Sequence, residues 1–154
     1  RVLFRSMRVV IQRVKEAQVS ISNMVVGEIG EGLVILVGFT DEDDQATTLK
    51  MAKKVSALRI FDDADGKMNL SLKDIGGEIL SISQFTLYGD AKKGNRPSFT
   101  NAANFIVANE LYNYFNHCLA QDYKVETGEF GAYMHVELVN DGPVTLILDS
   151  KELF

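Results

Sequence analysis

The segment LVILVGF at residues 33–39 constrains the fold more than any other part of this sequence, because it is apolar almost without interruption. A strand with one face in water alternates apolar and polar residues, whereas a strand covered on both faces does not need to. The segment therefore predicts a central strand that is buried on both faces.

Two other segments carry apolar residues at helical spacing. The first follows Thr40 and the acidic residues 41–44, which suit the start of a helix. Its predicted apolar face consists of Ala46, Leu49, Ala52, Val55 and Leu58. The second helix is predicted over residues 101–121, with an apolar face of Ala108, Leu111, Phe115, Cys118 and Leu119.

Segments rich in β-branched residues predict the other strands. They span residues 8–22, 25–29, 59–61, 68–72, 78–87, 125–127, 134–139 and 144–149. The last two are joined by Asn140-Asp141-Gly142-Pro143, in which Asn-Asp-Gly is typical of a hairpin turn but the proline is unusual. The predicted fold is α+β: a strongly curved, mostly antiparallel, barrel-like sheet with two helices packed outside.

The length of 154 residues fits one domain, which we assign to residues 7–154. The first six residues, RVLFRS, precede Met7 and are interpreted as a segment added before the natural start. No apolar run approaches the roughly 18 residues that cross a bilayer, so no membrane is expected. A single cysteine excludes an internal disulfide framework, and the expected location is the cytoplasm.

Metal and cofactor chemistry find no support in the sequence. Two histidines and one cysteine are too few, and too poorly spaced, for a zinc site. The sequence also lacks a GxSxG elbow, a Walker loop, a dinucleotide fingerprint and an HExxH helix. We therefore expect neither a metal nor a cofactor.

Charge limits the partners. A net charge of −5 argues against binding long nucleic acid through bulk electrostatics. The tightest basic cluster is Lys92, Lys93 and Arg96, which leaves room for a local contact with one RNA end. The alternative for this cluster is an ordinary solvated loop.

Polar side chains gather near the end of the predicted strand 78–87. Ser83, Gln84 and Thr86 stand there among apolar neighbours. A hydroxyl nucleophile needs a base beside it, and neither histidine is near in sequence. These residues are candidates for catalysis, or they satisfy backbone groups at a strand end.

Three segments resemble those of the D-aminoacyl-tRNA deacylase family. They are SQFTL at residues 83–87, KGNRPSF at 93–99 and NDGPVT at 140–145. The resemblance extends over essentially all of Met7–Asp149, including IQRV at 11–14 and RIFDDADGKMNLS at 59–71. Each motif alone is weak, and their order and spacing together carry the resemblance.

The resemblance implies a compact barrel-like fold, a two-fold homodimer with active sites at its interface, and aminoacyl-tRNA as the substrate. Ser83–Leu87 would line the pocket for the 3′-terminal adenosine and its esterified amino acid. Gly142-Pro143 matches a Gly-cisPro dipeptide that reaches into the partner's site. Its carbonyls would bind the α-ammonium group and exclude L side chains, but not glycine, so mischarged glycyl-tRNA is an expected substrate. The alternative for these two residues is a plain turn.

Other residues take roles from the same resemblance. Arg13 would hydrogen-bond the dipeptide, or it is an exposed strand arginine. Met134 would pack beside the dipeptide, or it belongs to the core. Lys92, Lys93 and Arg96 would contact phosphates of the acceptor stem.

The implied reaction is ester hydrolysis, with backbone N–H groups of Phe85 and Thr86 as oxyanion donors. We expect water to attack with help from the ribose 2′-OH, while Gln84 and Thr86 position it. The other mechanism makes Thr86 the nucleophile.

A different class of function is a non-catalytic nucleic-acid-binding module of the same fold. The chain ends at Phe154 without a basic tail, which favours the enzyme.

Overall fold

The structure is a computed structural model that describes residues 6–154. The interpretation of residues 1–5 as an added segment therefore lies outside the described residues. Ser6, which we grouped with them, is buried, and its hydroxyl donates to the Asp149 carboxylate.

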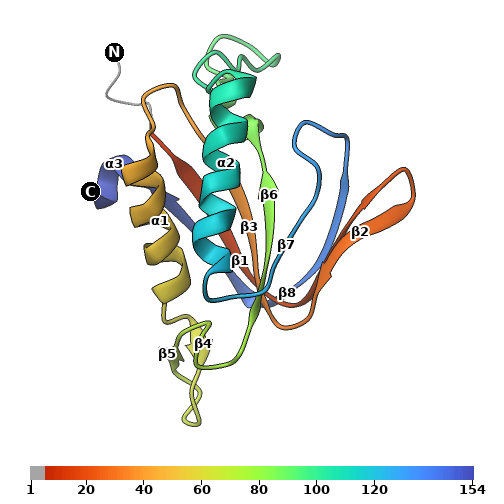
Figure 1. Cartoon of the computed structure of the whole chain (residues 1–154), viewed down its shortest axis with the longest axis vertical. Helices are drawn as coiled ribbons and strands as arrows, with labels where there is room; N and C mark the ends of the chain where they lie inside the picture. Colours follow the sequence, from red (N-terminus) through yellow and green to blue (C-terminus); the bar gives the residue numbers. More distant parts are fainter. Residues whose placement is uncertain (1–5) are drawn as a thin grey trace.

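Within residues 6–154, eight strands, three α-helices and one 3-10 helix follow one another (Figure 1). In order they are β1 (Arg8–Ile21), β2 (Met24–Ile29), β3 (Gly32–Gly38), α1 (Gln45–Ala57), β4 (Phe61–Asp62), β5 (Met68–Leu70), β6 (Glu78–Ser83), η2 (the 3-10 helix Phe85–Tyr88), α2 (Phe105–Ala120), β7 (Val125–Thr127), β8 (His135–Asp149) and α3 (Ser150–Leu153).

One six-stranded sheet dominates the fold. Its order is β2-β1-β3-β6-β7, with β8 paired to β1 as well. Pairs that involve β1 are antiparallel, whereas β3–β6 and β6–β7 are parallel, so the sheet is mixed. The sheet curls until β2 and β7 approach each other (Figure 1), and a Cβ on Gly27 would lie 2.9 Å from the Thr127 carbonyl oxygen. The predicted α+β barrel-like fold is confirmed.

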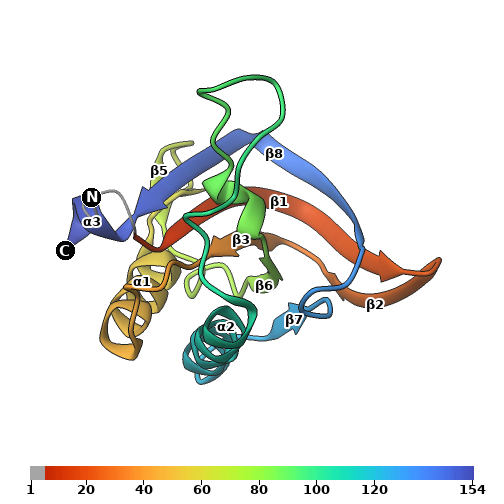
Figure 2. The ribbon, with the colours of Figure 1, turned by 90° about the horizontal axis from the view of Figure 1, so that it is seen from above.

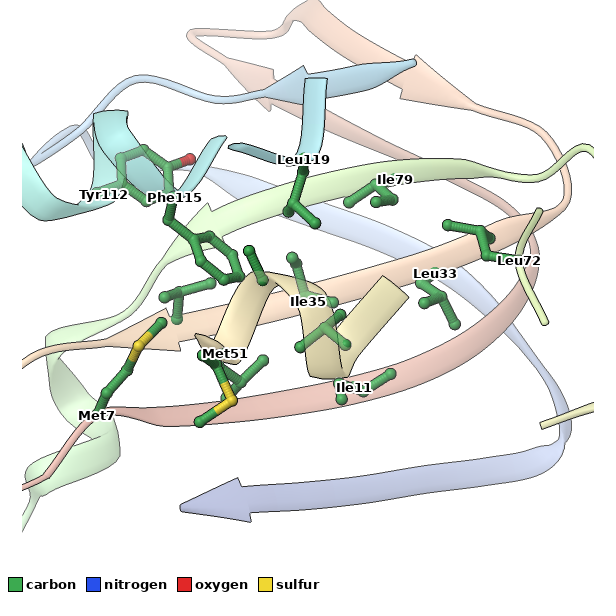
Figure 3. Packing of buried hydrophobic residues seen from close by; sticks show 14 of the residues in the cluster. Met7, Ile11, Leu33, Ile35, Met51, Leu72, Ile79, Tyr112, Phe115 and Leu119 are labelled. Atoms are coloured by element: carbon green, nitrogen blue, oxygen red, sulfur yellow. The ribbon is translucent and has the colours of Figure 1, made fainter. Parts of the chain in front are cut away.

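Strand β3 is buried on both faces, as the apolar run predicted. Leu33, Ile35 and Val37 pack toward the helices, and Figure 3 shows Leu33 and Ile35 in one cluster with Met51 and Phe115. Val34 belongs to a second cluster inside the curled sheet, with Val14, Ala17, Val19, Ile29, Leu80 and Ile82. Figure 2 shows α1 and α2 side by side on one side of the sheet.

The two long helices lie close to their predicted positions. Helix α1 begins after Asp44, whose side chain accepts a hydrogen bond from the Thr47 N–H at 2.9 Å. Its buried face contains the predicted Ala52 and Val55, but Ala46 is exposed and Met51 is buried instead. In α2, the predicted Leu111, Phe115 and Leu119 are buried. The four-residue α3 was not predicted.

Strand β6 is shorter than predicted, and its end creates a turn. The strand stops at Ser83, not at Leu87, and the next residues form η2. The Gln84 N–H still donates to the Val37 carbonyl at 2.8 Å. Beyond this point Gly38 allows the turn to fold over β3, because a Cβ there would lie 3.1 Å from the Gln84 carbonyl oxygen.

The predicted hairpin at residues 140–143 is wrong. Both predicted strands form the single strand β8, which runs along β1 from Asp149 to His135. The register places Thr145 opposite Gln12 and Asn140 opposite Val14, so residues 141–144 bulge out opposite Arg13. The Asn140 side chain closes the bulge: its Oδ1 accepts from the Val144 N–H at 2.7 Å, and its Nδ2 donates to the Val144 carbonyl at 3.3 Å.

A substitution at Gly32 tests whether β3 and β6 approach as closely as the structure shows. A Cβ on Gly32 would lie 1.9 Å from the Glu78 carbonyl oxygen, so the two strands must separate locally. We expect Gly32→Ala to lower the free energy of unfolding by about 2–3 kcal/mol in urea titration. Gly30→Ala is the matched control, since the nearest atom to its Cβ is Glu78 Oε1 at 3.9 Å. Equal losses in the two variants would contradict this packing.

Candidate active site

A cavity of about 510 Å³ lies where β3 and β6 end. Its polar part comes from Ser83, Gln84 and Phe85, which follow one another at the end of β6. Its apolar wall comes from the end of β3, the start of α2 and the segment before β8, and includes Phe39, Phe105, Ala108, Phe130, Tyr133 and Met134.

The turn η2 presents unpaired backbone donors next to this cavity. The first N–H groups of a helix have no partner within it. Among the described residues, no acceptor binds the N–H groups of Phe85 and Thr86, whereas the Gln84 N–H is bound to Val37. Phe85 is 60% exposed, so this side of the turn is open. The arrangement can bind an oxygen that carries negative charge.

Among residues 6–154, no histidine, carboxylate or lysine is hydrogen-bonded to the Thr86 hydroxyl. Its partner is the Gln84 side-chain amide, whose Nε2 donates to Thr86 Oγ1. An amide cannot remove a proton from a hydroxyl at neutral pH. This geometry suits a positioning role for both side chains.

Aromatic rings form much of the cavity wall, and the sequence patterns did not predict their place there. The rings of Phe105 and Phe130 meet edge to face with centroids 4.7 Å apart. Gly131 makes room for this pair, because a Cβ there would lie 2.8 Å from Phe105 Cε1. Tyr133 is 85% exposed at the same wall. These residues stand out only as large apolar side chains that stay exposed after folding. The sequence alone does not show which side chains stay exposed.

The bulge in β8 lies outside this cavity. Gly142 and Pro143 are exposed, and the peptide bond between them is cis. Neither residue lines the cavity of its own chain, whereas Met134 does. Gly142 has a φ of 139°, and a Cβ there would lie 3.0 Å from the Val144 nitrogen, so glycine is required.

Arg13 anchors the bulge from β1, and it is buried instead of exposed. Its Nε donates to the Asp141 carbonyl at 2.8 Å. Its Nη1 donates to the Ile60 carbonyl at 2.8 Å and pairs with Asp62 at 3.3 Å. The planar guanidinium group thereby holds the backbone at the start of the bulge against the segment that leads into β4.

The basic loop between η2 and α2 extends away from the sheet (Figure 2). Lys92, Lys93 and Arg96 are exposed, and within residues 6–154 none of them forms an ion pair. A backbone bridge between Asp90 and Ser98 closes the loop. Its three cations are therefore available to a polyanion.

Two negative findings apply to the described residues alone. No helix of residues 6–154 is long and apolar enough to cross a membrane. No group of three or more His, Cys, Asp or Glu residues in that range is arranged to hold a metal ion.

A family model described as D-Tyr-tRNA(Tyr) deacylase matches residues 10–149. The chain belongs to this family. It is an enzyme of the hydrolase class that acts on the ester bond of an aminoacyl-tRNA. The expected family membership is confirmed by this match.

Two solved structures resemble the deacylase over nearly its whole length. One, described as a c-Myc DNA unwinding element binding protein, is 40% identical with a TM-score of 0.86, covering 92% of this chain and 97% of that chain. The other, described as a probable eukaryotic D-amino acid tRNA deacylase, is 20% identical with a TM-score of 0.80, covering 94% and 99%. At 20% identity, the second structure shows a shared fold and nothing more.

Removing the Arg13 side chain should destabilise the deacylase. Arg13→Met leaves the carbonyls of Ile60 and Asp141 without their donor, so we expect a loss of about 2 kcal/mol in the free energy of unfolding. Arg59→Met is the control, because the Arg59 side chain is exposed and bonds to the neighbouring hairpin at Asn69. Urea titration of both variants checks the difference, and a loss at Arg13 no larger than at Arg59 would show that the guanidinium group does not anchor the bulge.

Proposed function

We propose that this deacylase removes D-amino acids from tRNA with a site built from the cavity of one subunit and the β8 bulge of another. The observation that carries the proposal is the pair of free N–H groups of Phe85 and Thr86 beside an aromatic cavity. The donors suit the oxyanion of ester hydrolysis, and the aromatic wall suits a nucleoside.

The 3′-terminal adenosine enters the cavity. Base stacking on aromatic rings contributes about 1–3 kcal/mol per base and needs no particular sequence. Phe105 and Tyr133 offer exposed aromatic surface at the cavity wall. Ser83 and Gln84 add polar groups where β6 ends, which is where the ribose and the ester are placed.

Water attacks the ester carbonyl, and the 2′-OH of the terminal ribose assists. The oxyanion that forms accepts hydrogen bonds from the Phe85 and Thr86 N–H groups. When this intermediate collapses, the bond to the ribose 3′ oxygen breaks, and that oxygen takes up the proton lost by the water, relayed by the 2′-OH. The free amino acid and the tRNA with its 3′-OH are the products. Gln84 and Thr86 position the reactants through their shared side-chain hydrogen bond. No protein nucleophile, metal or cofactor takes part in this mechanism.

Chirality is read by Gly142 and Pro143 of a second subunit in a two-fold homodimer. Both residues are exposed on their own chain and lie outside its cavity, so they are free to enter another. Their carbonyl oxygens accept from the substrate α-ammonium group and occupy the space that an L side chain needs. Glycine has no side chain to exclude, so glycyl-tRNA mischarged on a non-cognate tRNA is also a substrate. Met134 packs beside the incoming dipeptide.

The basic loop binds the tRNA outside the cavity. Lys92, Lys93 and Arg96 contact phosphates of the acceptor stem, which is a local contact compatible with a net charge of −5. Aminoacyl-tRNA is made and used in the cytoplasm, and we place the enzyme there.

A second candidate function is non-catalytic binding of nucleic acid. It is favoured by the 40% identical protein described as a c-Myc DNA unwinding element binding protein. The family match describes a deacylase, and an aromatic cavity beside free N–H donors suits an esterified nucleoside, so this candidate comes second.

The test compares D-tyrosyl-tRNA with L-tyrosyl-tRNA as substrates of the wild-type protein. We expect rapid release of D-tyrosine and little release of L-tyrosine. Nucleic-acid binding without hydrolysis of either ester would favour the non-catalytic binding function. Equal hydrolysis of both esters would contradict the proposed chirality mechanism.

Thr86→Ala distinguishes the two chemical mechanisms. If backbone donors and the substrate hydroxyl carry the reaction, the variant should keep activity within about tenfold of wild type, since it loses one positioning hydrogen bond. Single-turnover hydrolysis of D-tyrosyl-tRNA measures this. A rate that falls to the uncatalysed level while tRNA binding persists would instead make Thr86 the nucleophile.

A further inference from the structure

Arg8 lies in a row of three residues across the sheet. Asp149 on β8 and Gly38 on β3 are its register partners on either side. The Arg8 Nε lies 3.3 Å from Asp149 Oδ2, which orients the guanidinium group. The missing side chain on Gly38 leaves space beside it.

Tyr88, the last residue of η2, fills that space. A Cβ on Gly38 would lie 2.7 Å from Tyr88 Cε2, and the Arg8 guanidinium lies 5.0 Å from the centre of the Tyr88 ring. The ring is buried, and its hydroxyl donates to the Ser6 carbonyl. Burial raises the pKa of the Tyr88 hydroxyl, so it remains a neutral donor. Tyr88 thereby fixes the end of η2 between β1 and β3.

Arg8 also bonds directly to the turn. Its Nη1 donates to the Leu87 carbonyl at 3.0 Å. The last carbonyls of a helix have no partner within it, and a cation is favourable there. The start of the turn is fixed separately, because the Gln84 N–H donates to Val37. The backbone of Phe85 and Thr86 is thus held between two anchors, and only the second involves a charged side chain.

We propose that Arg8 is a positioning residue for deacylation: by holding the Leu87 carbonyl and the Tyr88 ring, it aims the N–H groups of Phe85 and Thr86 at the reacting ester. The inference rests on the proposed function of that turn. Arg8 does not line the active-site cavity; with Tyr88 and Lys92 it lines a second cavity beside the basic loop. A positioning role changes the rate of the chemical step, whereas a contact with RNA at that loop would change substrate affinity. A misplacement of about 1 Å in the N–H donors can cost about 100-fold in rate.

The experiment uses the 154-residue chain and D-tyrosyl-tRNA under single-turnover conditions, over a range of enzyme concentrations. We compare Arg8→Met, Arg8→Gln and the control Arg59→Met. Arg8→Met should lower the maximal rate constant about tenfold or more, with the half-saturating enzyme concentration changed by no more than about twofold. Arg8→Gln keeps one donor and should fall between Arg8→Met and wild type. Amide exchange at Leu87–Gly89 should quicken in Arg8→Met and not in the control.

The outcomes separate this inference from the proposed function. If wild type does not hydrolyse D-tyrosyl-tRNA, the proposed function fails, and amide exchange still tests the anchor. If wild type is active and Arg8→Met matches Arg59→Met in rate, the inference is overturned. A change confined to the half-saturating concentration and its salt dependence also overturns it, because Arg8 would then contact RNA. If Arg8→Met does not fold, Arg8→Gln decides: a selective loss of rate supports the inference, and no loss refutes it.

Discussion

The pairing of β1 with three other strands is the constraint on which the rest of the structure depends. Its first half pairs with β3 and its second half with β2, while β8 runs along the opposite edge. This register brings Arg8 beside the turn that ends β6 and places Arg13 opposite the bulge in β8. Both candidate segments are therefore positioned from one strand, although they are more than 50 residues apart in sequence.

Local sequence was sufficient where burial alone decides the structure. Residues 33–39 are buried on both faces because they are apolar throughout. Phe115 and Leu119 are buried because their spacing places them on the apolar face of one helix. Local sequence failed where a distant residue decides. Asn-Asp-Gly resembles a hairpin turn, but Arg13 and the pairing of both flanks with β1 make it a bulge within one strand. Phe85–Tyr88 has the composition of a strand, but Gly38 and Arg8 hold it as a turn.

The sequence identified only part of the candidate site, because the rest is assembled by residues distant in sequence. The resemblance identified Ser83–Phe85, Met134 and Gly142-Pro143, and the structure brings the first two onto one cavity. The aromatic wall escaped notice, because Phe105 and Tyr133 come from a helix start and a loop that meet only in the folded chain. A backbone carbonyl or N–H group leaves no mark in the identity of its side chain, so the roles proposed for Phe85 and Gly142 depend on geometry.

The central claim is that each site joins the cavity of one subunit to the bulge of the other, and mixing two inactive variants tests it most directly. Gly142→Ala disturbs the bulge, whereas Phe85→Pro removes one cavity N–H at the first position of a helix, where proline fits. Each variant alone should be inactive on D-tyrosyl-tRNA. After subunit exchange, each mixed dimer holds one intact site, so an equal mixture should recover about a quarter of wild-type activity if pairing in a two-fold dimer is random. An inactive mixture in which mass spectrometry shows mixed dimers would contradict the account.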